Sequence, residues 1–251
     1  MEETFKPKVA WYKTGWGIVI LAAICLIVAA ALAIGALVFN YWRMIKSGQG
    51  DFLRQKFYGQ QANFLTVEDE ATKKARAALE TTDDPYLGNP NGDLVIVEFI
   101  DLKCPICKGV YADMERLIGK YGYRVKWIVR DFPMESVHPG TSQLAEFASC
   151  ANEQGGFWPV HDYFFQNQDK IGETFSSDDA AKLAESFGLN KDKISECLKS
   201  GRAKTEVNRD YADGYAYGVT RGTPVFFVNG RKVDGGIPYD RWEKMLKDLG
   251  F

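Results

Sequence analysis

Two cysteines separated by two residues are the part of this chain that most clearly suggests chemistry. Cys104 and Cys107 enclose Pro105 and Ile106 and follow a short apolar run at 94–100. Apolar positions then recur at spacings of three and four, which predicts an amphipathic helix that begins at the first cysteine. Unpaired N–H groups and the helix dipole stabilise a thiolate at such an N-terminus. We therefore predict a redox-active dithiol in which Cys104 attacks and Cys107 resolves the mixed disulfide.

A carboxylate interrupts the apolar run, six residues before the first cysteine. Burying Glu98 is costly unless the side chain has a partner or a task. One interpretation is that Glu98 relays a proton to or from Cys107. The others are a satisfied structural carboxylate or a position on an exposed strand edge, and the sequence leaves these open.

The same motif also occurs in zinc sites and in inert structural disulfides. A structural zinc ion usually needs four ligands. The chain has no second C-x-x-C, and its two histidines, His138 and His161, are not in close ligand spacing. We therefore expect no metal and no cofactor apart from the Cys104–Cys107 disulfide itself, and we interpret His161 as a packed side chain.

An uncharged apolar segment at 17–39 is long enough to cross a bilayer core of roughly 30 Å. Aromatic residues flank it on both sides, as in interfacial belts: Trp11, Tyr12, Trp16, Tyr41 and Trp42. A cleaved signal peptide is the alternative, but its apolar core is usually about 7–15 residues. We predict a cytoplasmic tail at 1–16 and a transmembrane anchor at 17–42.

The remaining pattern predicts an α/β fold with a mixed sheet. Near-neutral net charge, −2, and the lack of a long basic run argue against nucleic acid as a partner. The predicted parts are a polar stalk at 43–88 with a helix near 66–79, a domain at 89–251 with strands at 94–100 and 125–129, an all-helical insert at about 136–219, a hairpin at 224–233 and a final helix at 242–249.

Three blocks of this sequence resemble DsbA-like proteins of the thioredoxin superfamily over about residues 86–250. The blocks are Val97–Cys107, which matches the active-site strand and helix, Cys150–Trp158 with His161-Asp162 in the helical insert, and Gly222–Gly230 at the cis-proline loop. The resemblance implies a thioredoxin-like mixed sheet with an inserted all-helical subdomain. It also implies that Pro224 is a cis-proline and that the backbone of Thr223 pairs with an extended substrate chain.

One residue departs from the best-known strongly oxidising members of the family. Those members carry a histidine between the cysteines, where this chain has Pro105-Ile106. An isoleucine cannot donate a hydrogen bond to the Cys104 thiolate, so oxidising strength does not follow from the resemblance.

Two further cysteines, Cys150 and Cys197, lie on apolar helix faces of the predicted insert. We predict a structural disulfide between them, with two buried free thiols as the alternative. Disulfides persist in oxidising compartments, so this pairing would place the domain outside the cytoplasm. The lysines and arginines around the apolar segment are nearly balanced and do not set its orientation. Cys25 is interpreted as an apolar filler of the anchor.

Together these features predict a membrane-anchored, extracytoplasmic protein thiol–disulfide oxidoreductase. The expected partners are reduced client proteins and, by the resemblance, a quinone-linked membrane protein that reoxidises the dithiol, either DsbB-like or vitamin K epoxide reductase-like. One alternative is the same dithiol working as a reductase or isomerase. Another is a non-enzymatic metal-handling or assembly factor on a thioredoxin scaffold.

Overall fold

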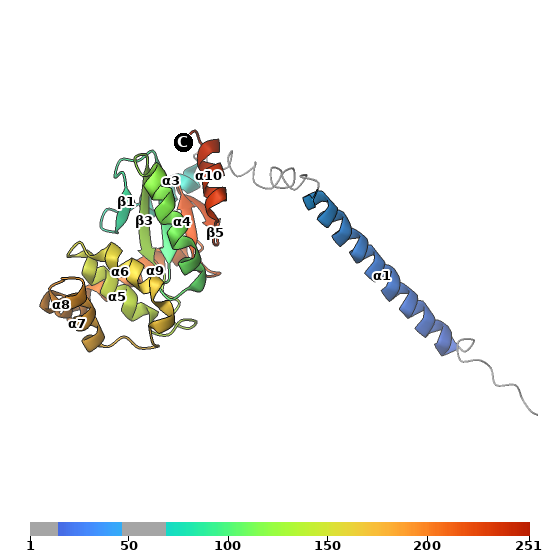
Figure 1. Cartoon of the computed structure of the whole chain (residues 1–251), viewed down its shortest axis with the longest axis horizontal. Coiled ribbons are helices and arrows are strands. Elements are labelled where there is room, and N and C mark those ends of the chain that lie inside the picture. The colour runs from blue at the N-terminus through green and yellow to red at the C-terminus, as the bar shows by residue number, and fades with distance from the viewer. Residues whose placement is uncertain (1–14, 47–68) are drawn as a thin grey trace, which may run out of the picture. The chain divides into compact units, whose positions relative to one another are not determined.

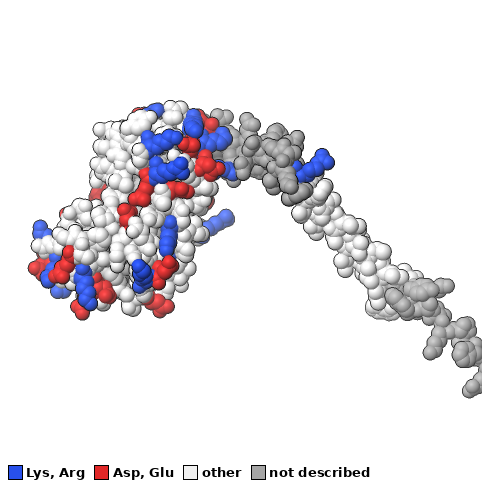
Figure 2. All heavy atoms as spheres, in the orientation of Figure 1, with Lys and Arg blue, Asp and Glu red and all other residues white. Residues whose placement is uncertain are grey.

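The computed structural model describes residues 15–46 and 69–251, and the chain divides into two units at residue 61. The described part of the first unit is helix α1 (Gly15–Lys46). Its segment Ile18–Asn40 has a mean hydropathy of 3.1 and none of it is buried. Figure 2 shows this helix almost free of charged side chains. By length and composition α1 can cross a membrane, and a signal sequence would share both properties.

Part of the predicted anchor region cannot be compared with the structure. The proposed cytoplasmic tail and the aromatic residues Trp11 and Tyr12 fall outside the described residues, apart from the last two positions of the tail. Trp16, at the start of α1, is 81% exposed, and Cys25 lies exposed on the same helix.

The second unit is a mixed five-stranded sheet with helices packed on it (Figure 1). Its strands and longer helices are α3 (Glu70–Leu79), β1 (Tyr86–Gly88), β2 (Leu94–Ile100), α4 (Pro105–Tyr121), β3 (Val125–Asp131), α5 (Thr141–Asn152), α6 (Phe157–Gln166), α7 (Ser177–Ser186), α8 (Lys191–Ser200), α9 (Arg202–Ala216), β4 (Val225–Val228), β5 (Arg231–Asp234) and α10 (Tyr239–Asp248).

The strands lie in the order β1-β3-β2-β4-β5, with β2 parallel to β3 and the other pairs antiparallel. All seven residues of the central strand β2 are buried, because apolar layers cover both faces of the sheet. Successive side chains of a strand point to opposite faces. The apolar even-numbered residues of β2 therefore pack in one core with α4, α10 and the helical insert, and the odd-numbered residues pack in a second core with α3.

The predicted stalk at 43–88 is wrong over its last twenty residues, which belong to the folded domain. Asp69 caps α3, and Ala75 and Leu79 are buried in the second core. β1 pairs antiparallel with β3, placing Tyr86 opposite Ile128. Both elements are short, so they owe their stability to the sheet they pack on rather than to a local pattern.

The helical insert predicted at about 136–219 is confirmed, since this segment contains helices α5–α9, a short 3₁₀ turn at Gln168–Lys170 and no strand. Figure 1 shows these helices gathered at one end of the domain. A disulfide between Cys150 on α5 and Cys197 on α8 ties two of them together across 47 residues of sequence. Both cysteines are 1% exposed.

Removing this disulfide should weaken the domain substantially. Closing a loop of 47 residues stabilises by about 4 kcal/mol in the chain-entropy model. The variant with Cys150→Ser and Cys197→Ser should therefore unfold at clearly lower denaturant than the wild type. Chemical denaturation of both proteins measures this difference, with Cys25→Ser as a control that leaves the insert untouched. Equal midpoints, or no Cys150–Cys197 peptide by mass spectrometry without reduction, would contradict the prediction.

Candidate active site

The predicted dithiol lies where the central strand meets the first long helix of the domain. Cys104 is the N-cap residue of α4, and Pro105 occupies the first turn, where its missing N–H costs nothing. Both thiols are free and buried, with Cys104 5% and Cys107 1% exposed, whereas Ile106 between them is 56% exposed. The more accessible of the two sulfurs is thus the one predicted to attack.

A buried aspartate that sequence analysis did not single out holds the loop before the dithiol. Oδ1 of Asp101 accepts hydrogen bonds from the backbone N–H of Lys103 at 2.8 Å and the Thr141 hydroxyl at 2.6 Å. Its Oδ2 accepts from the backbone N–H of Met134 at 2.8 Å and lies 2.9 Å from Nδ1 of His138. Asp101 therefore ties the start of α4 to the loop after β3 and to the insert.

The pairing of β4 with β2 brings the predicted proline loop to the dithiol. Phe99 lies opposite Val225 in this antiparallel pair, so the residues just before Val225 lie beside those just after Phe99. The Thr223–Pro224 peptide is cis. The Cys104 thiol donates a hydrogen bond to the carbonyl oxygen of Thr223 at 3.3 Å. The structure therefore places Thr223, Pro224 and Cys104 together, as the resemblance implied.

The two thiols differ strongly in acidity. A hydrogen bond from the Cys107 thiol lowers the pKa of Cys104 to about 5 against the opposing effect of burial, with help from the Thr223 side chain and the backbone N–H groups of Cys107 and Ile106. Burial raises the pKa of Cys107 well above its ordinary value, and the neighbouring Cys104 and Glu98 raise it further. Near neutral pH the reduced site therefore holds a Cys104 thiolate beside a neutral Cys107 thiol.

Glu98 lies inside the sheet, which rules out a position on an exposed strand edge. It is 2% exposed, with Val129 on β3 and Phe226 on β4 as its strand partners. Its Oε2 accepts a hydrogen bond from Nε1 of Trp127 at 2.9 Å. Burial raises the pKa of Glu98 to about 8, partly offset by this bond. The carboxyl group is therefore satisfied and titrates near neutral pH, on the face of the sheet that carries α4.

The two histidines occupy different environments, and neither supports a zinc site at the dithiol. His138 contacts Asp101, as described above. His161 is 1% exposed, packs edge-on against Trp127 and Phe165, and has its Nδ1 2.8 Å from Oδ1 of Asp162. Within residues 15–46 and 69–251, no cluster of three or more possible ligands includes either active-site cysteine.

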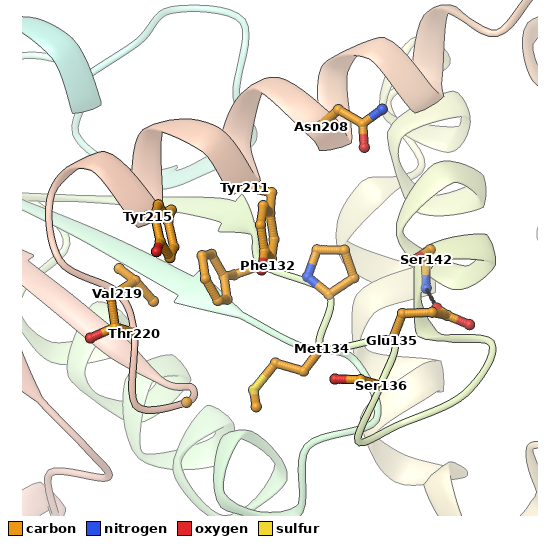
Figure 3. Close-up of a pocket in the computed structure, with 12 residues that line it drawn as sticks. Phe132, Met134, Glu135, Ser136, Ser142, Asn208, Tyr211, Tyr215, Val219 and Thr220 are labelled. Carbon is orange, nitrogen blue, oxygen red and sulfur yellow. Dashed lines mark hydrogen bonds between the residues drawn. The ribbon is translucent and has the colours of Figure 1, made fainter.

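A hollow of about 430 Å³ adjoins the proline loop at Gly222 (Figure 3). Figure 3 shows Tyr211 and Tyr215 projecting into it from α9 and Met134 approaching from the loop after β3. The Tyr211 ring stacks on Phe132 with centroids 4.4 Å apart. The hollow combines aromatic surface with backbone from the loop that contacts the Cys104 thiol.

We expect the Cys104 thiol to ionise with a midpoint near pH 5, because the hydrogen bonds from the Cys107 thiol, the Thr223 side chain and two backbone N–H groups favour its thiolate. The measurement is the ultraviolet thiolate absorbance of the reduced protein across a pH titration, with Cys104→Ser as the control that removes the transition. A midpoint near the ordinary thiol value of about 8.5 would contradict the assignment.

Replacing Glu98 by glutamine should change how stability depends on pH. Between pH 4.5 and about 8 the unfolded chain has lost the Glu98 proton while the folded protein keeps it, so wild-type stability falls as pH rises. Relative to Glu98→Gln, the reduced wild type should lose about 1 kcal/mol per pH unit in this window. Chemical denaturation at several pH values measures this, with exposed Glu196→Gln as the control. A difference that is constant with pH would refute a protonated buried Glu98.

Comparison with known proteins places the chain in a family. A family model described as thioredoxin matches residues 80–248. A Na⁺/H⁺ antiporter NhaA 3 from Salinispora tropica is 32% identical over 157 residues, which cover 62% of this chain and 23% of that protein. A Na⁺/H⁺ antiporter NhaA from Herminiimonas arsenicoxydans is 30% identical over 170 residues, or 66% of this chain and 26% of that protein. The matches thus span about a quarter of the length of these relatives.

Solved structures show the same fold. The thiol-disulfide exchange protein α-DsbA2 from Wolbachia pipientis has a TM-score of 0.61 and 20% identity, over 76% of this chain and 98% of that one. BdbD from Bacillus subtilis has a TM-score of 0.58 and 23% identity, over 67% and 94% of the two chains. With the family model, the mixed sheet and the helical insert in agreement, this chain belongs to the thioredoxin family and has a DsbA-like fold.

Proposed function

We propose that this protein is a membrane-anchored, extracytoplasmic thiol–disulfide oxidoreductase that donates the Cys104–Cys107 disulfide to reduced secreted or membrane proteins. The observation that carries the proposal is the low pKa of Cys104, about 5, beside the raised pKa of Cys107. A stabilised thiolate lowers the free energy of the reduced site, so the disulfide form becomes the better oxidant.

The exchange proceeds in two steps that conserve electrons. A client thiolate attacks Sγ of Cys104 and breaks the Cys104–Cys107 bond, which leaves Cys107 as a thiolate in need of a proton. A second client thiolate then attacks the client sulfur of the mixed disulfide and expels Cys104. The client gains a disulfide and the site becomes a dithiol. Because its pKa is low, Cys104 is a good leaving group in the second step.

Glu98 is suited to supply the proton in the first step. Its pKa of about 8 keeps it protonated at neutral pH, and once ionised it raises the pKa of Cys107, so the two groups interact. General acid catalysis by a positioned carboxyl group contributes about 10²–10⁴-fold in rate. Glu98 is thus the proton relay in this proposal, with Trp127 holding its carboxylate.

Clients would bind along the proline loop. The backbone of Thr223 is positioned to pair with an extended chain whose cysteine reaches Cys104. The hollow beside Gly222 would receive a neighbouring side chain of the same segment, with Tyr211 and Tyr215 as its aromatic wall. Reoxidation would fall to a quinone-linked membrane partner, DsbB-like or vitamin K epoxide reductase-like, and an anchor formed by α1 would keep the domain near it.

The reduction potential of the Cys104/Cys107 couple distinguishes donation from reduction. We expect a value closer to about −120 mV, typical of a strong oxidant, than to about −270 mV, typical of thioredoxin. Equilibration with glutathione buffers, read by mass spectrometry after alkylation, measures it. A reduction potential near that of thioredoxin would instead favour a reductase or isomerase. The Ile106 side chain is compatible with that function, because it donates no hydrogen bond to the Cys104 thiolate.

Exchange activity itself tests whether the protein is an enzyme. Cys104→Ser should abolish disulfide transfer to reduced ribonuclease A, because without the Cys104 sulfur the site can form no disulfide to donate. Cys25→Ser should keep full activity as the matched control. Full retention of the biological function in Cys104→Ser would favour a non-enzymatic binding or assembly factor.

A further inference from the structure

A tight turn at residues 101–104 joins the central strand β2 to the dithiol helix α4. The backbone N–H of Cys104 donates to the carbonyl oxygen of Asp101 at 2.9 Å, a hydrogen bond of the kind that closes a β-turn. The Asp101 side chain reinforces this turn, because its Oδ1 accepts from the backbone N–H of Lys103, two residues along the chain, at 2.8 Å. Asp101 thus sets the backbone conformation that leads into Cys104.

The carboxylate of Asp101 is fully buried and is held through both of its oxygens. Besides the Lys103 N–H, Oδ1 accepts a hydrogen bond from the hydroxyl of Thr141, in the first turn of the insert helix α5. Oδ2 accepts from the backbone N–H of Met134, in the loop after β3, and lies 2.9 Å from Nδ1 of His138. Each oxygen therefore receives a backbone N–H, and the turn is tied to two segments that are distant in the sequence.

The same turn determines which polar groups face the two sulfurs. Burial raises the pKa of the Cys107 thiol, and a hydrogen bond from the backbone N–H of Asp101 opposes this rise. The Cys107 thiol and the backbone N–H groups of Cys107 and Ile106 lower the pKa of Cys104. Because α4 begins directly after the turn, a change in the turn would redirect these N–H groups. Asp101 can therefore influence both sulfurs through the backbone, although the contacts of its carboxylate described above all go to nitrogen or oxygen.

We propose that Asp101 is a positioning residue of the dithiol: its carboxylate fixes the turn so that the start of α4 stabilises the attacking thiolate, and it thereby helps to set the oxidising strength of the couple. This inference rests on the proposed thiol–disulfide exchange. Asparagine has nearly the same shape but only one accepting oxygen in its side chain. Whichever way its amide turned, its NH₂ group would face the backbone N–H of Lys103 or that of Met134. One buried N–H would lose its partner, and the turn should loosen.

Charge and geometry predict opposite effects of Asp101→Asn on the Cys104 thiol. Removal of a nearby negative charge would by itself favour the thiolate and lower the pKa of Cys104. A looser turn would weaken the hydrogen bonds at the helix start and raise this pKa from about 5 toward the ordinary thiol value of about 8.5. A purely structural role would reduce stability and leave the pKa unchanged. Only the positioning role predicts a rise.

Thiolate absorbance and equilibration with glutathione test the proposal on the full-length chain in mild detergent, in a Cys25→Ser background. Asp101→Asn should raise the ionisation midpoint of Cys104 by about one pH unit or more, because the thiolate loses stabilisation. The reduced site then becomes less stable, so the equilibrium constant for oxidising glutathione should fall about tenfold, which corresponds to about 30 mV.

The matched control is Asp179→Asn, at the exposed start of the insert helix α7. The Asp179 carboxylate also accepts a backbone N–H, at 2.9 Å, and a hydroxyl, at 2.6 Å, both from Ser176. Loss of this cap should lower stability and leave the Cys104 midpoint and the glutathione equilibrium unchanged. The comparison separates a lower stability of the insert from a change at the dithiol.

A second pair of variants removes one donor to the carboxylate and leaves Asp101 in place. Thr141→Val deletes the hydroxyl bound to Oδ1 and should also raise the Cys104 midpoint, by less than Asp101→Asn does. Thr141→Ser keeps the hydroxyl and should restore the midpoint of the parent chain. If Asp101→Asn does not fold, this pair decides the question, and equal midpoints in both Thr141 variants would overturn the proposal.

Two further outcomes distinguish this inference from the proposed function. A Cys104 midpoint that is near pH 5 in the parent chain and is unchanged or lower in Asp101→Asn would overturn the positioning role alone. A midpoint near 8.5 in the parent chain would instead overturn the proposed function, and the positioning role with it.

Discussion

Antiparallel pairing between β2 and β4 determines where the reactive groups of this protein lie. With Phe99 opposite Val225, the chain entering β4 must pass the chain leaving β2. The segment entering β4 carries Thr223 and Pro224, and the segment leaving β2 carries Cys104. A slip of one residue in this register would turn every side chain of β4 to the other face and separate the loop from the thiol. Burial of β2 on both faces makes such a slip very costly.

The active site depends on different pKa shifts of three neighbouring acidic groups: the thiols of Cys104 and Cys107 and the carboxyl group of Glu98. Burial alone raises the pKa of a thiol or a carboxyl group. Cys107 and Glu98 follow that rule. Cys104 departs from it, because it lies at the helix start, where the N–H groups of Ile106 and Cys107 and the neighbouring thiol favour its anion. A separation of only three residues along α4 therefore distinguishes the attacking sulfur from the resolving one.

The sequence predicted most of the elements that hold the dithiol, because a buried strand, an amphipathic helix and an Asn-Gly turn each leave a local pattern. It did not predict the inclusion of α3 and β1 in the domain, since Ala75, Leu79 and Tyr86 acquire their roles only through the sheet. Asp101 was also missed, although its position directly after a buried strand was a usable signal.

The position of α3 bears on where this domain can be cut. The family match begins at residue 80, just after the helix ends. A chain shortened to that point would lose Ala75 and Leu79 from the core that holds Val97, Phe99 and Phe227. It would also lose the ion pair between Asp69 and Arg231. Such a fragment would expose an apolar patch and tend to aggregate. A piece that covers its own sheet must therefore include α3 and its cap, Asp69.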